Sequence, residues 1–322
     1  MVVCQRLNVK LRPTTTELLT SRNFQIGISG ADGEEEFNLP KFYISQVNTD
    51  EQTGEKSVTC YDWIKQTETA TFNDLNITAP YTFGDILTAI ATRYGAETQY
   101  INIANSMIDN NFPNGANLEG KEKLKDCLKW IAEYMGAVIY INDANNLIIR
   151  RLNKDSEANW IIAQSNQFSL KSGDTKRLGK VINVTELGDN IEAHTTETGS
   201  TQVIIENPFI AVKNPATVVN NLISVLGGIT ITPFEMEWRG NLNMKIGQKL
   251  QINTAEANIS TFLLDETITY DGGLTSKMRW HWDTSKEADE SANPSTIGDA
   301  IYSTIAKVDK VNKRIDLAVS DV

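Results

Sequence analysis

The sequence predicts an α+β protein that is mostly β, in which small β-barrel-like domains carry an inserted α/β module and a C-terminal coiled-coil stalk. Three observations predict this fold class. Short β-rich runs separated by turn residues extend to residue 282, two amphipathic helical patterns interrupt them, and the last residues repeat apolar side chains with heptad spacing. With 322 residues, of which 40% are hydrophobic, the chain is long enough to form two or more cores.

Residues 1–72 are predicted to form the first β-barrel-like domain. Turn clusters at residues 30–33 and 50–54 separate runs that alternate or are rich in β-branched and aromatic side chains, namely 6–10, 24–28, 42–47 and 57–63. Short strands with a turn about every ten residues are typical of a small barrel or sandwich.

Residues 73–152 are predicted to form an α/β module. Thr82 and Asp85 have the spacing of a helix-capping pair, and they precede an apolar stripe that ends at Gly95. The stripe consists of Ile86, Leu87, Ile90, Ala91 and Tyr94. This pattern predicts the first helix of the module.

A second helix of the module is predicted over residues 121–134, with Gly136 as its stop. Two strands follow, at 137–141 and 145–150, and an Asn-Asp turn joins them. Two helices and a hairpin make a compact unit.

Strands return after the module. Runs at 169–185 and 200–206 assign residues 153–205 to a β connecting domain, and residues 206–285 are predicted to form a second β-rich domain. This second domain begins with an amphipathic helix over 215–226. It continues with strands at 234–238, 249–253, 260–270 and 276–282.

Residues 286–322 are predicted to be a polar linker and the start of a trimeric helical stalk. In heptad notation the a positions are Ile305, Asn312 and Val319, and the d positions are Ile301, Val308, Ile315 and Val322. β-Branched residues at both positions favour three or four strands, and a single Asn at an a position fixes the register of the strands. We expect these seven residues to form a trimer interface.

An alternative for this segment is a single amphipathic helix packed on its own domain. The polar remainder of the helix is charged nearly all round, which favours an exposed rod. The seam continues to the last residue, and we expect it to be the start of a stalk cut from a longer protein.

Composition argues against several classes of protein. A formal net charge of -11 without a basic run disfavours nucleic-acid binding, which needs clustered Lys and Arg. Cys4, Cys60 and Cys127 lack CxxC spacing, so buried thiols and synthesis in a reducing cytoplasm are expected. No apolar run approaches the roughly 20 residues of a membrane span, so no membrane segment is expected.

No catalytic or metal-binding motif is recognisable. The two histidines, His194 and His281, are not part of an HExxH motif, and the chain has no GxSxG elbow. The acidic run at 32–36 lacks the EF-hand pattern and is interpreted as a solvated loop. We therefore expect no catalytic residue, no metal and no cofactor, although the many acids leave a paired-carboxylate hydrolase open.

Three tryptophans have two interpretations. Trp238, Trp280 and Trp282 lie at alternating positions of predicted strands, where they could form a sugar-binding platform. The interpretation we favour places one or more of them in a barrel core.

Four segments of the C-terminal half stand out by their order and spacing: 206–210 (ENPFI), 233–240 (PFEMEWRG), 245–252 (KIGQKLQI) and 270–276 (YDGGLTS). Together they resemble the hub proteins of bacteriophage tails. This family includes the N-terminal domain of tail-associated lysins and the prophage tail endopeptidase-like proteins. The stretches TFGDILTAIA at 82–91 and LKWIA at 128–132 are similar to the family's second domain. The resemblance covers nearly the whole chain to Trp282, although each motif is degenerate.

The resemblance implies a structural hub of a phage or prophage tail tip or baseplate. Such hubs are homotrimers in which two β-barrel-like tube domains per subunit form a pseudo-sixfold ring, braced by the peripheral α/β domains. The ring closes or extends the tail tube and carries a central fibre or spike. Its implied partners are the distal tail protein, the tape-measure protein and other tail-tip proteins. DNA would pass through the channel without specific binding.

The implied location is the tail tip of a virion whose proteins are made in the host cytoplasm. In longer family members the hub is followed by fibre, carbohydrate-binding or hydrolase modules, which this sequence does not contain. No enzymatic activity is therefore carried over from the family. A tail-associated peptidoglycan hydrolase and a host-binding adhesin remain the alternative functions, and the tail type, contractile or not, stays open.

Overall fold

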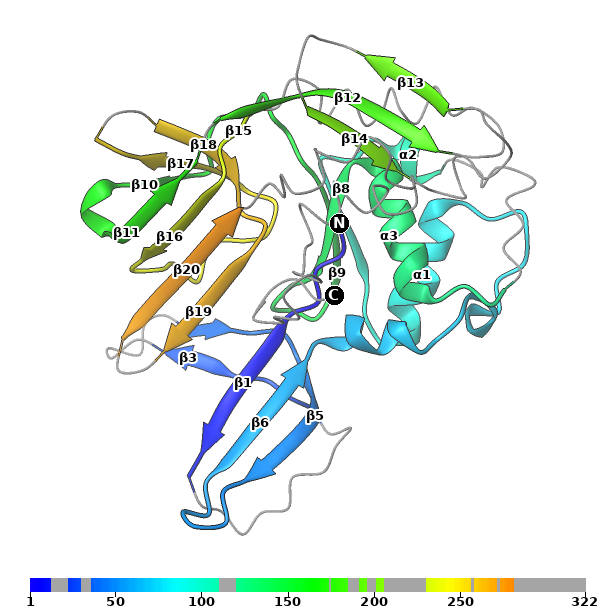
Figure 1. The fold of residues 1–322 in the computed structure, drawn as a ribbon. Helices are drawn as coiled ribbons and strands as arrows, with labels where there is room; N and C mark the ends of the chain where they lie inside the picture. Colours follow the sequence, from blue (N-terminus) through cyan, green and yellow to red (C-terminus); the bar gives the residue numbers. More distant parts are fainter. Residues whose placement is uncertain are drawn as a thin grey trace.

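The computed structural model describes residues 1–12, 23–29, 36–109, 120–173, 175–184, 191–195, 201–205, 230–255, 258–270 and 273–280. Within these residues strands predominate, in several small sheets beside a helical module, which confirms the α+β, mostly β, fold class (Figure 1). Each described sheet is open. The barrel-like form of the β-rich domains stays a prediction, as do the domain boundaries.

The N-terminal sheet has the strand order β1-β6-β5-β2. Its members are β1 (Arg6–Leu11), β2 (Asn23–Phe24), β5 (Phe42–Thr49) and β6 (Lys56–Tyr61), all antiparallel to their neighbours. One face carries a small core of Phe42, Ile44, Val58 and Cys60. Alternation along β5 and β6 produces this face because successive strand residues point to opposite sides.

The predicted strand at 24–28 is wrong as a single element. The chain leaves β2 after Phe24 and forms β3 (Gly27–Ser29), which pairs with β4 (Glu36–Asn38) in a separate sheet. Gln25 lies at the break, and its Nε2 donates to the carbonyl of Leu39 at 2.8 Å. The Leu39 amide in turn donates to the carbonyl of Ile26 at 2.9 Å. These bonds turn the chain from one sheet into the other.

The predicted strand at 57–63 ends at Tyr61, because Asp62 begins a 3-10 helix, η1 (Trp63–Glu68). The Asp62 carboxylate accepts hydrogen bonds from the amides of Ile64 at 3.0 Å and Gln5 at 2.9 Å. The side chain of Asp62 therefore satisfies a helix start and ties it to the N-terminal segment.

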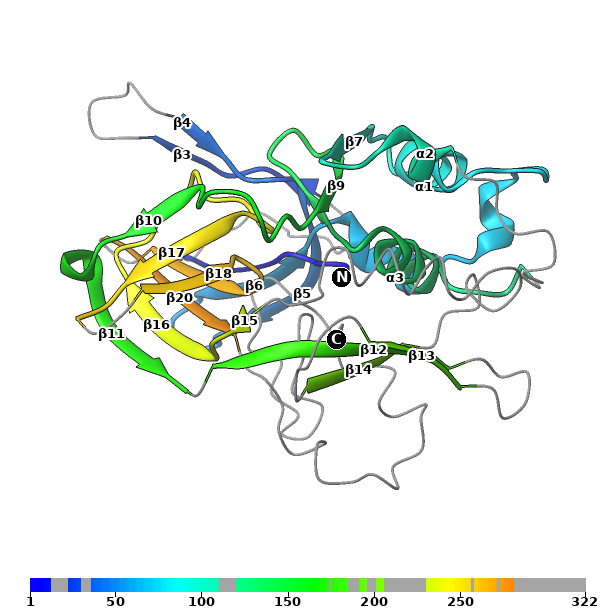
Figure 2. The ribbon, with the colours of Figure 1, turned by 90° about the horizontal axis from the view of Figure 1, so that it is seen from above.

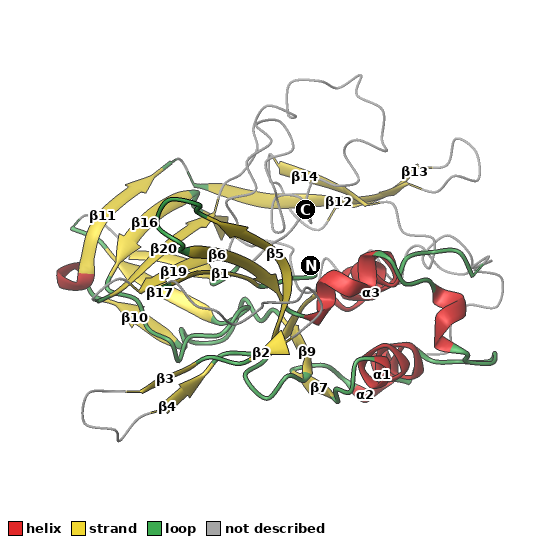
Figure 3. Cartoon of the chain, turned by 90° about the horizontal axis from the view of Figure 1, so that it is seen from below, coloured by secondary structure: helices red, strands yellow, loops and turns green. Residues whose placement is uncertain are grey.

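The α/β module combines helices with the three-stranded sheet β7-β9-β8. Its elements are η2 (Phe72–Leu75), α1 (Phe83–Arg93), β7 (Thr98–Ile101), α2 (Asn105–Ile108), α3 (Leu124–Met135), β8 (Ala137–Ile141) and β9 (Leu147–Arg151). The helices α1, α2 and α3 lie together on one side of the molecule (Figure 3).

Local sequence signals explain both long helices. The amide of Asp85 donates to Thr82 Oγ1 at 3.0 Å, and the Thr82 amide donates to Asp85 Oδ2 at 2.8 Å, which confirms the predicted capping pair. Gly136 ends α3 with φ of 59°, a left-handed conformation that glycine adopts without steric cost. The strand β7 was not predicted.

The first residues of the chain pack into this module. Val2 forms a parallel bridge with Ile139, the Val3 amide donates to the carbonyl of Ile139 at 2.7 Å, and the Ile139 amide donates to the carbonyl of Met1 at 2.8 Å. Met1, Val2, Val3 and Cys4 are all buried. They therefore extend the module's sheet beyond β8, although the strands that follow them belong to a different sheet.

The C-terminal part contains two facing sheets, which we call the sandwich. The first sheet has the order β10-β17-β18, with β10 (Trp160–Ile162), β17 (Lys249–Asn253) and β18 (Asn258–Phe262). The second has the order β11-β16-β20-β19, with β11 (Gln167–Ser172), β16 (Phe234–Trp238), β19 (Glu266–Tyr270) and β20 (Leu274–Trp280). A short 3-10 helix, η3 (Gln164–Asn166), connects β10 to β11.

Two predicted strands of this part are wrong as single elements. The stretch 260–270 breaks between β18 and β19, where the Leu263 amide donates to the carbonyl of Gln248 at 2.9 Å. The stretch 169–185 breaks at Gly173, whose amide donates to the carbonyl of Pro233 at 2.9 Å. In both cases the chain moves to another sheet. The alternation of apolar side chains continues along the sequence, but the strand with which the chain pairs changes.

A long strand, β12 (Lys176–Val184), runs from the sandwich toward the helical module (Figure 2). It pairs with β13 (Ile191–Thr195), β14 (Thr201–Ile205) and β15 (Thr230–Ile231). The predicted helix at 215–226 and the predicted stalk lie outside the described residues. No helix within the described ranges is long and apolar enough to cross a membrane.

A single hydrophobic core joins the module to the sandwich. Gly247 lies at their contact with φ of 78°, and a Cβ added there would lie 2.6 Å from Val138 Cγ2 and 2.8 Å from Arg150 Cδ. Beside it, Lys249 Nζ donates to the carbonyls of Lys154 at 2.5 Å and Ser156 at 2.6 Å. The close approach at Gly247 therefore depends on a residue without a side chain.

We predict that Gly247→Ala lowers the free energy of unfolding by about 2 to 5 kcal/mol. Alanine is disfavoured in the left-handed backbone conformation, and its Cβ would overpack the contact with Val138 and Arg150. The matched control is Gly95→Ala. Gly95 has φ of 68° but no atom within 4 Å of an added Cβ. This control should lose only about 1 to 2 kcal/mol. Chemical denaturation measures both, and equal losses would show that the contact at Gly247 is not tight.

Candidate assembly surface

The described residues show little catalytic chemistry. They contain no group of three or more His, Cys, Asp or Glu side chains that could hold a metal ion. The three cysteines are buried and free, and burial raises the pKa of the Cys127 thiol to about 12 and that of Cys60 to about 11. Both thiols therefore stay protonated at neutral pH and are poor nucleophiles.

The structure describes only some of the candidate residues that the sequence suggests. The side chain of Trp238 is buried in the core, which confirms the core interpretation for this tryptophan. His194 lies on β13, and His281 and Trp282 lie outside the described residues, as do all seven predicted trimer-interface residues. Those seven are Ile301, Ile305, Val308, Asn312, Ile315, Val319 and Val322, and they stay a prediction.

The most conspicuous surface feature is a set of exposed large apolar side chains. They are Ile161 (62% exposed), Phe168 (58%), Ile268 (39%) and Tyr270 (67%). All four lie on edge strands of the sandwich, Ile161 on β10, Phe168 on β11 and the other two on β19. Scattered exposed apolar residues are ordinary, but their placement on sheet edges is informative.

A β-bulge on β11 accounts for the exposure of Phe168. The pairing of β11 with β16 shifts between Gln167 and Ser169, so Phe168 has no partner in the ladder. Gln167 fixes this irregularity, because its Nε2 donates to the carbonyl of Asn253 at 2.8 Å in the other sheet. The bulge is therefore held in place, and Phe168, which has no partner in the ladder, is exposed.

On the opposite edge, β19 extends its inner face beyond the core. Glu266, Ile268 and Tyr270 share one face of the strand, because side chains alternate. Their exposed fractions rise along the strand from 4% through 39% to 67%. Ile268 lies opposite Ser276 and Tyr270 opposite Leu274 on β20. The face that is core at Glu266 thus becomes an uncovered apolar surface two residues later.

Glu266 is a buried carboxyl next to that surface. Burial raises its pKa to about 7, while a hydrogen bond from Ser276 Oγ at 2.6 Å and the charge of Asp265 act against each other. Asp265 is itself paired with Arg279 Nε at 2.7 Å. The inner side of β19 is therefore poorly hydrated at Glu266.

The other face of the same sheet is charged. Lys277 on β20 pairs with Glu235 on β16 at 2.7 Å, and Glu237 is exposed beside them. The sheet thus has one polar face, one apolar face and two edge strands, β11 and β19, on its opposite sides (Figure 1). Such edges carry unpaired backbone groups that can pair with another chain.

Sequence reasoning missed these four residues. The alternation at 266–270 is visible in the sequence, but no pattern shows that the face carrying Ile268 and Tyr270 is left exposed. The bulge at Phe168 likewise has no glycine or proline signal.

Comparisons with known proteins give a structural match without a sequence match. A scan against protein-family models finds no match, and a search of curated proteins finds no relative. A tail protein from Neisseria meningitidis MC58 matches with a TM-score of 0.54 and 14% identity, covering 85% of this chain and 91% of that chain.

Two prophage proteins match comparably. The 43 kDa tail protein of prophage MuSo2 from Shewanella oneidensis has a TM-score of 0.55 and 11% identity, over 92% of this chain and 94% of its own. The prophage tail protein gp18 from Listeria monocytogenes EGD-e has a TM-score of 0.51 and 12% identity, over 95% and 93%. At these identities the matches establish a shared fold.

We predict that Glu266→Gln stabilises the protein above pH 7. The folded-state pKa is raised above the ordinary value of 4.5 to about 7, so the native carboxyl favours its proton. Below pH 4.5 the Glu266 carboxyl makes its full contribution to the free energy of unfolding. As the pH rises through 7 this contribution is lost, and the free energy of unfolding falls by roughly 3 kcal/mol. Urea denaturation at pH 4 and pH 8 tests this. A stabilisation that is equal at both values would contradict the titration of Glu266.

Proposed function

We propose that this protein is a structural component of a phage or prophage tail tip or baseplate, and that it forms the trimeric hub ring there. The observation that carries the proposal is the shared fold with three tail proteins, two of them from prophages, which extends over at least 85% of this chain and 91% of each of theirs. The match extends over most of each chain and is not limited to one module, so the proposal rests on likeness of the whole fold.

The edges of the sandwich support a ring. Exposed apolar side chains lie on β19 (Ile268 and Tyr270) and on β11 (Phe168), the two edge strands of one sheet, so the β19 edge of one copy can meet the β11 edge of the next. This is a heterologous, head-to-tail contact, and it produces a closed ring when the rotation between copies closes. Burying Tyr270 and Phe168 against each other would also remove two sheet edges from solvent.

The predicted stalk supports three as the number of copies. The β-branched seam from Ile301 to Val322 favours three or four strands, and Asn312 fixes their register. In such a trimer the ring closes or extends the tail tube, the stalk leads to a central fibre or spike, and the tape-measure and distal tail proteins are neighbours. The net charge of -11 suits a channel that releases DNA.

We predict that the unaltered protein is a trimer by light scattering and that Ile305→Asp combined with Ile315→Asp weakens it. Carboxylates in the seam would have to lose hydration without a partner. A second variant, Phe168→Asp with Tyr270→Asp, should weaken the ring contact separately. The matched control is Lys277→Asp on the charged face of the same sheet, which should leave the mass unchanged. A monomeric unaltered protein at high concentration would contradict the proposal.

We also predict that the protein has no hydrolytic turnover. Purified Gram-positive cell wall incubated with it should release no reducing ends or free amino groups beyond those of a heat-killed control. Release that disappears on changing a single carboxylate would instead establish the peptidoglycan-hydrolase alternative.

A further inference from the structure

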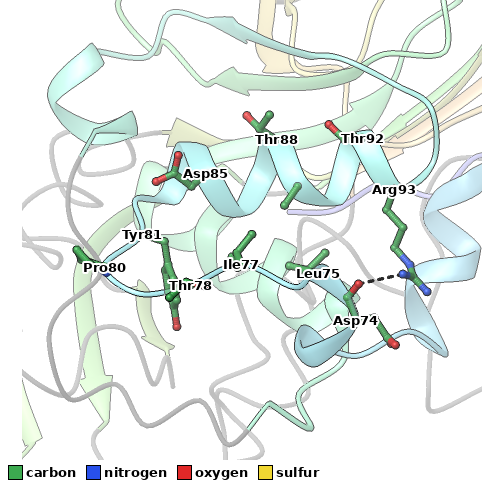
Figure 4. A pocket seen from close by; sticks show the side chains of 11 residues that line it. Asp74, Leu75, Ile77, Thr78, Pro80, Tyr81, Asp85, Thr88, Thr92 and Arg93 are labelled. Carbon is green, nitrogen blue, oxygen red and sulfur yellow. Dashed lines mark hydrogen bonds between the residues drawn. The ribbon is translucent and has the colours of Figure 1, made fainter.

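A groove of about 720 Å³ lies on the helical module, between α1 and the segment 74–81 that leads into it (Figure 4). This volume is within the range of small-ligand sites. The groove is on the side of the molecule away from β11 and β19, so it does not belong to the candidate assembly surface (Figure 1). No step of the hub proposal uses it.

The groove has an apolar floor and polar walls. Leu75 and Ile77 pack against the hydrophobic core from the segment side, and they point toward α1 in Figure 4. Thr88 and Thr92 line the groove from α1, and both are exposed. A ligand in this groove would therefore meet aliphatic carbon below and hydrogen-bonding groups at the sides.

A carboxylate lies at each end of the groove, and each one is held by the hydrogen bonds of a helix cap. Asp85 Oδ2 accepts hydrogen bonds from the amide of Thr82 at 2.8 Å and from its hydroxyl at 2.9 Å. Asp74 Oδ2 accepts the corresponding bonds from Thr71 at 2.7 and 3.1 Å. Each set of capping bonds ends on one oxygen, so Oδ1 of each carboxylate can accept hydrogen bonds from a ligand. Groups fixed in advance lose little freedom on binding.

The end at Asp74 also carries a cation. Arg93 Nη1 donates to the main-chain carbonyl of Asp74 at 3.0 Å, which positions the guanidinium at the end of α1. Backbone hydrogen bonding from Thr71 lowers the pKa of Asp74, so this carboxylate stays ionised at neutral pH. The groove therefore offers fixed acceptors at both ends and a fixed donor at one.

We infer that this groove binds an uncharged oligosaccharide. Sugar hydroxyls donate to carboxylates and accept from guanidinium groups, and the C–H faces of sugar rings pack on aliphatic floors such as Leu75 and Ile77. The helical rise from Asp85 to Arg93 is about 12 Å, which matches two or three sugar rings in length. Two carboxylates against one guanidinium disfavour anionic saccharides, and so does the net charge of -11.

The test uses the full chain on an array of uncharged and anionic oligosaccharides, followed by calorimetric titration of the best binder. We expect an uncharged di- or trisaccharide to bind, and Thr92→Trp, which fills the groove, to weaken binding at least tenfold. The matched control is Thr49→Trp, an exposed threonine at the end of β5 that does not line the groove. It should bind like the unaltered protein.

If the Thr92→Trp protein does not fold, a second variant still tests binding in the groove. Arg93→Gln retains the helix and removes the cation, and we expect it to weaken binding several-fold without changing the melting temperature by more than a few degrees. Binding of anionic glycans alone, of a lysine-rich peptide instead of glycans, or of nothing would overturn the inference. So would full binding by Thr92→Trp. None of these outcomes depends on whether the protein forms a ring.

Discussion

The close packing of the Gly247 loop against β8 and β9 is the contact on which the rest of the structure depends. At this point a Cβ would lie 2.6 Å from Val138, so the loop and the module's sheet touch with no space for a side chain. One hydrophobic core continues from the helices through this contact into the sandwich. The module and the sandwich therefore share one core, and a closely packed protein interior resists deformation.

The shared core fixes the orientation of the edge strands β11 and β19 relative to the module. A sandwich that moved freely on a linker could not hold β11 and β19 at fixed angles to the rest of the chain. Here Gln167 ties the β11 bulge to the facing sheet, and Glu266 ties β19 to β20 through Ser276. The apolar residues beyond these ties, Phe168 and Tyr270, are thus presented in defined directions. A defined direction is what a closed ring of identical subunits requires.

Local signals in the sequence predicted much of the fold. The capping pair Thr82–Asp85 and the stop at Gly136 were read correctly because caps depend on residues a few positions apart. The strands at 234–238 and 249–253 were placed correctly by alternation. Errors arose where the chain changes sheets, at Gln25, Gly173 and Leu263, because alternation persists while the hydrogen-bonding partner changes. The burial of Met1–Cys4 depends on Ile139, far along the chain, and no local pattern reveals it.

The candidate sites were harder to predict. The exposure of Ile268 depends on which part of β19 other segments cover, and the groove depends on how residues 74–81 lie beside α1. The most direct measurement of the ring contact is an electron-microscopy reconstruction of the purified protein. A threefold ring with a central hole, in which β11 of one copy lies beside β19 of the next, is the expected result. Isolated monomers, or a ring in which both edges face solvent, would contradict it.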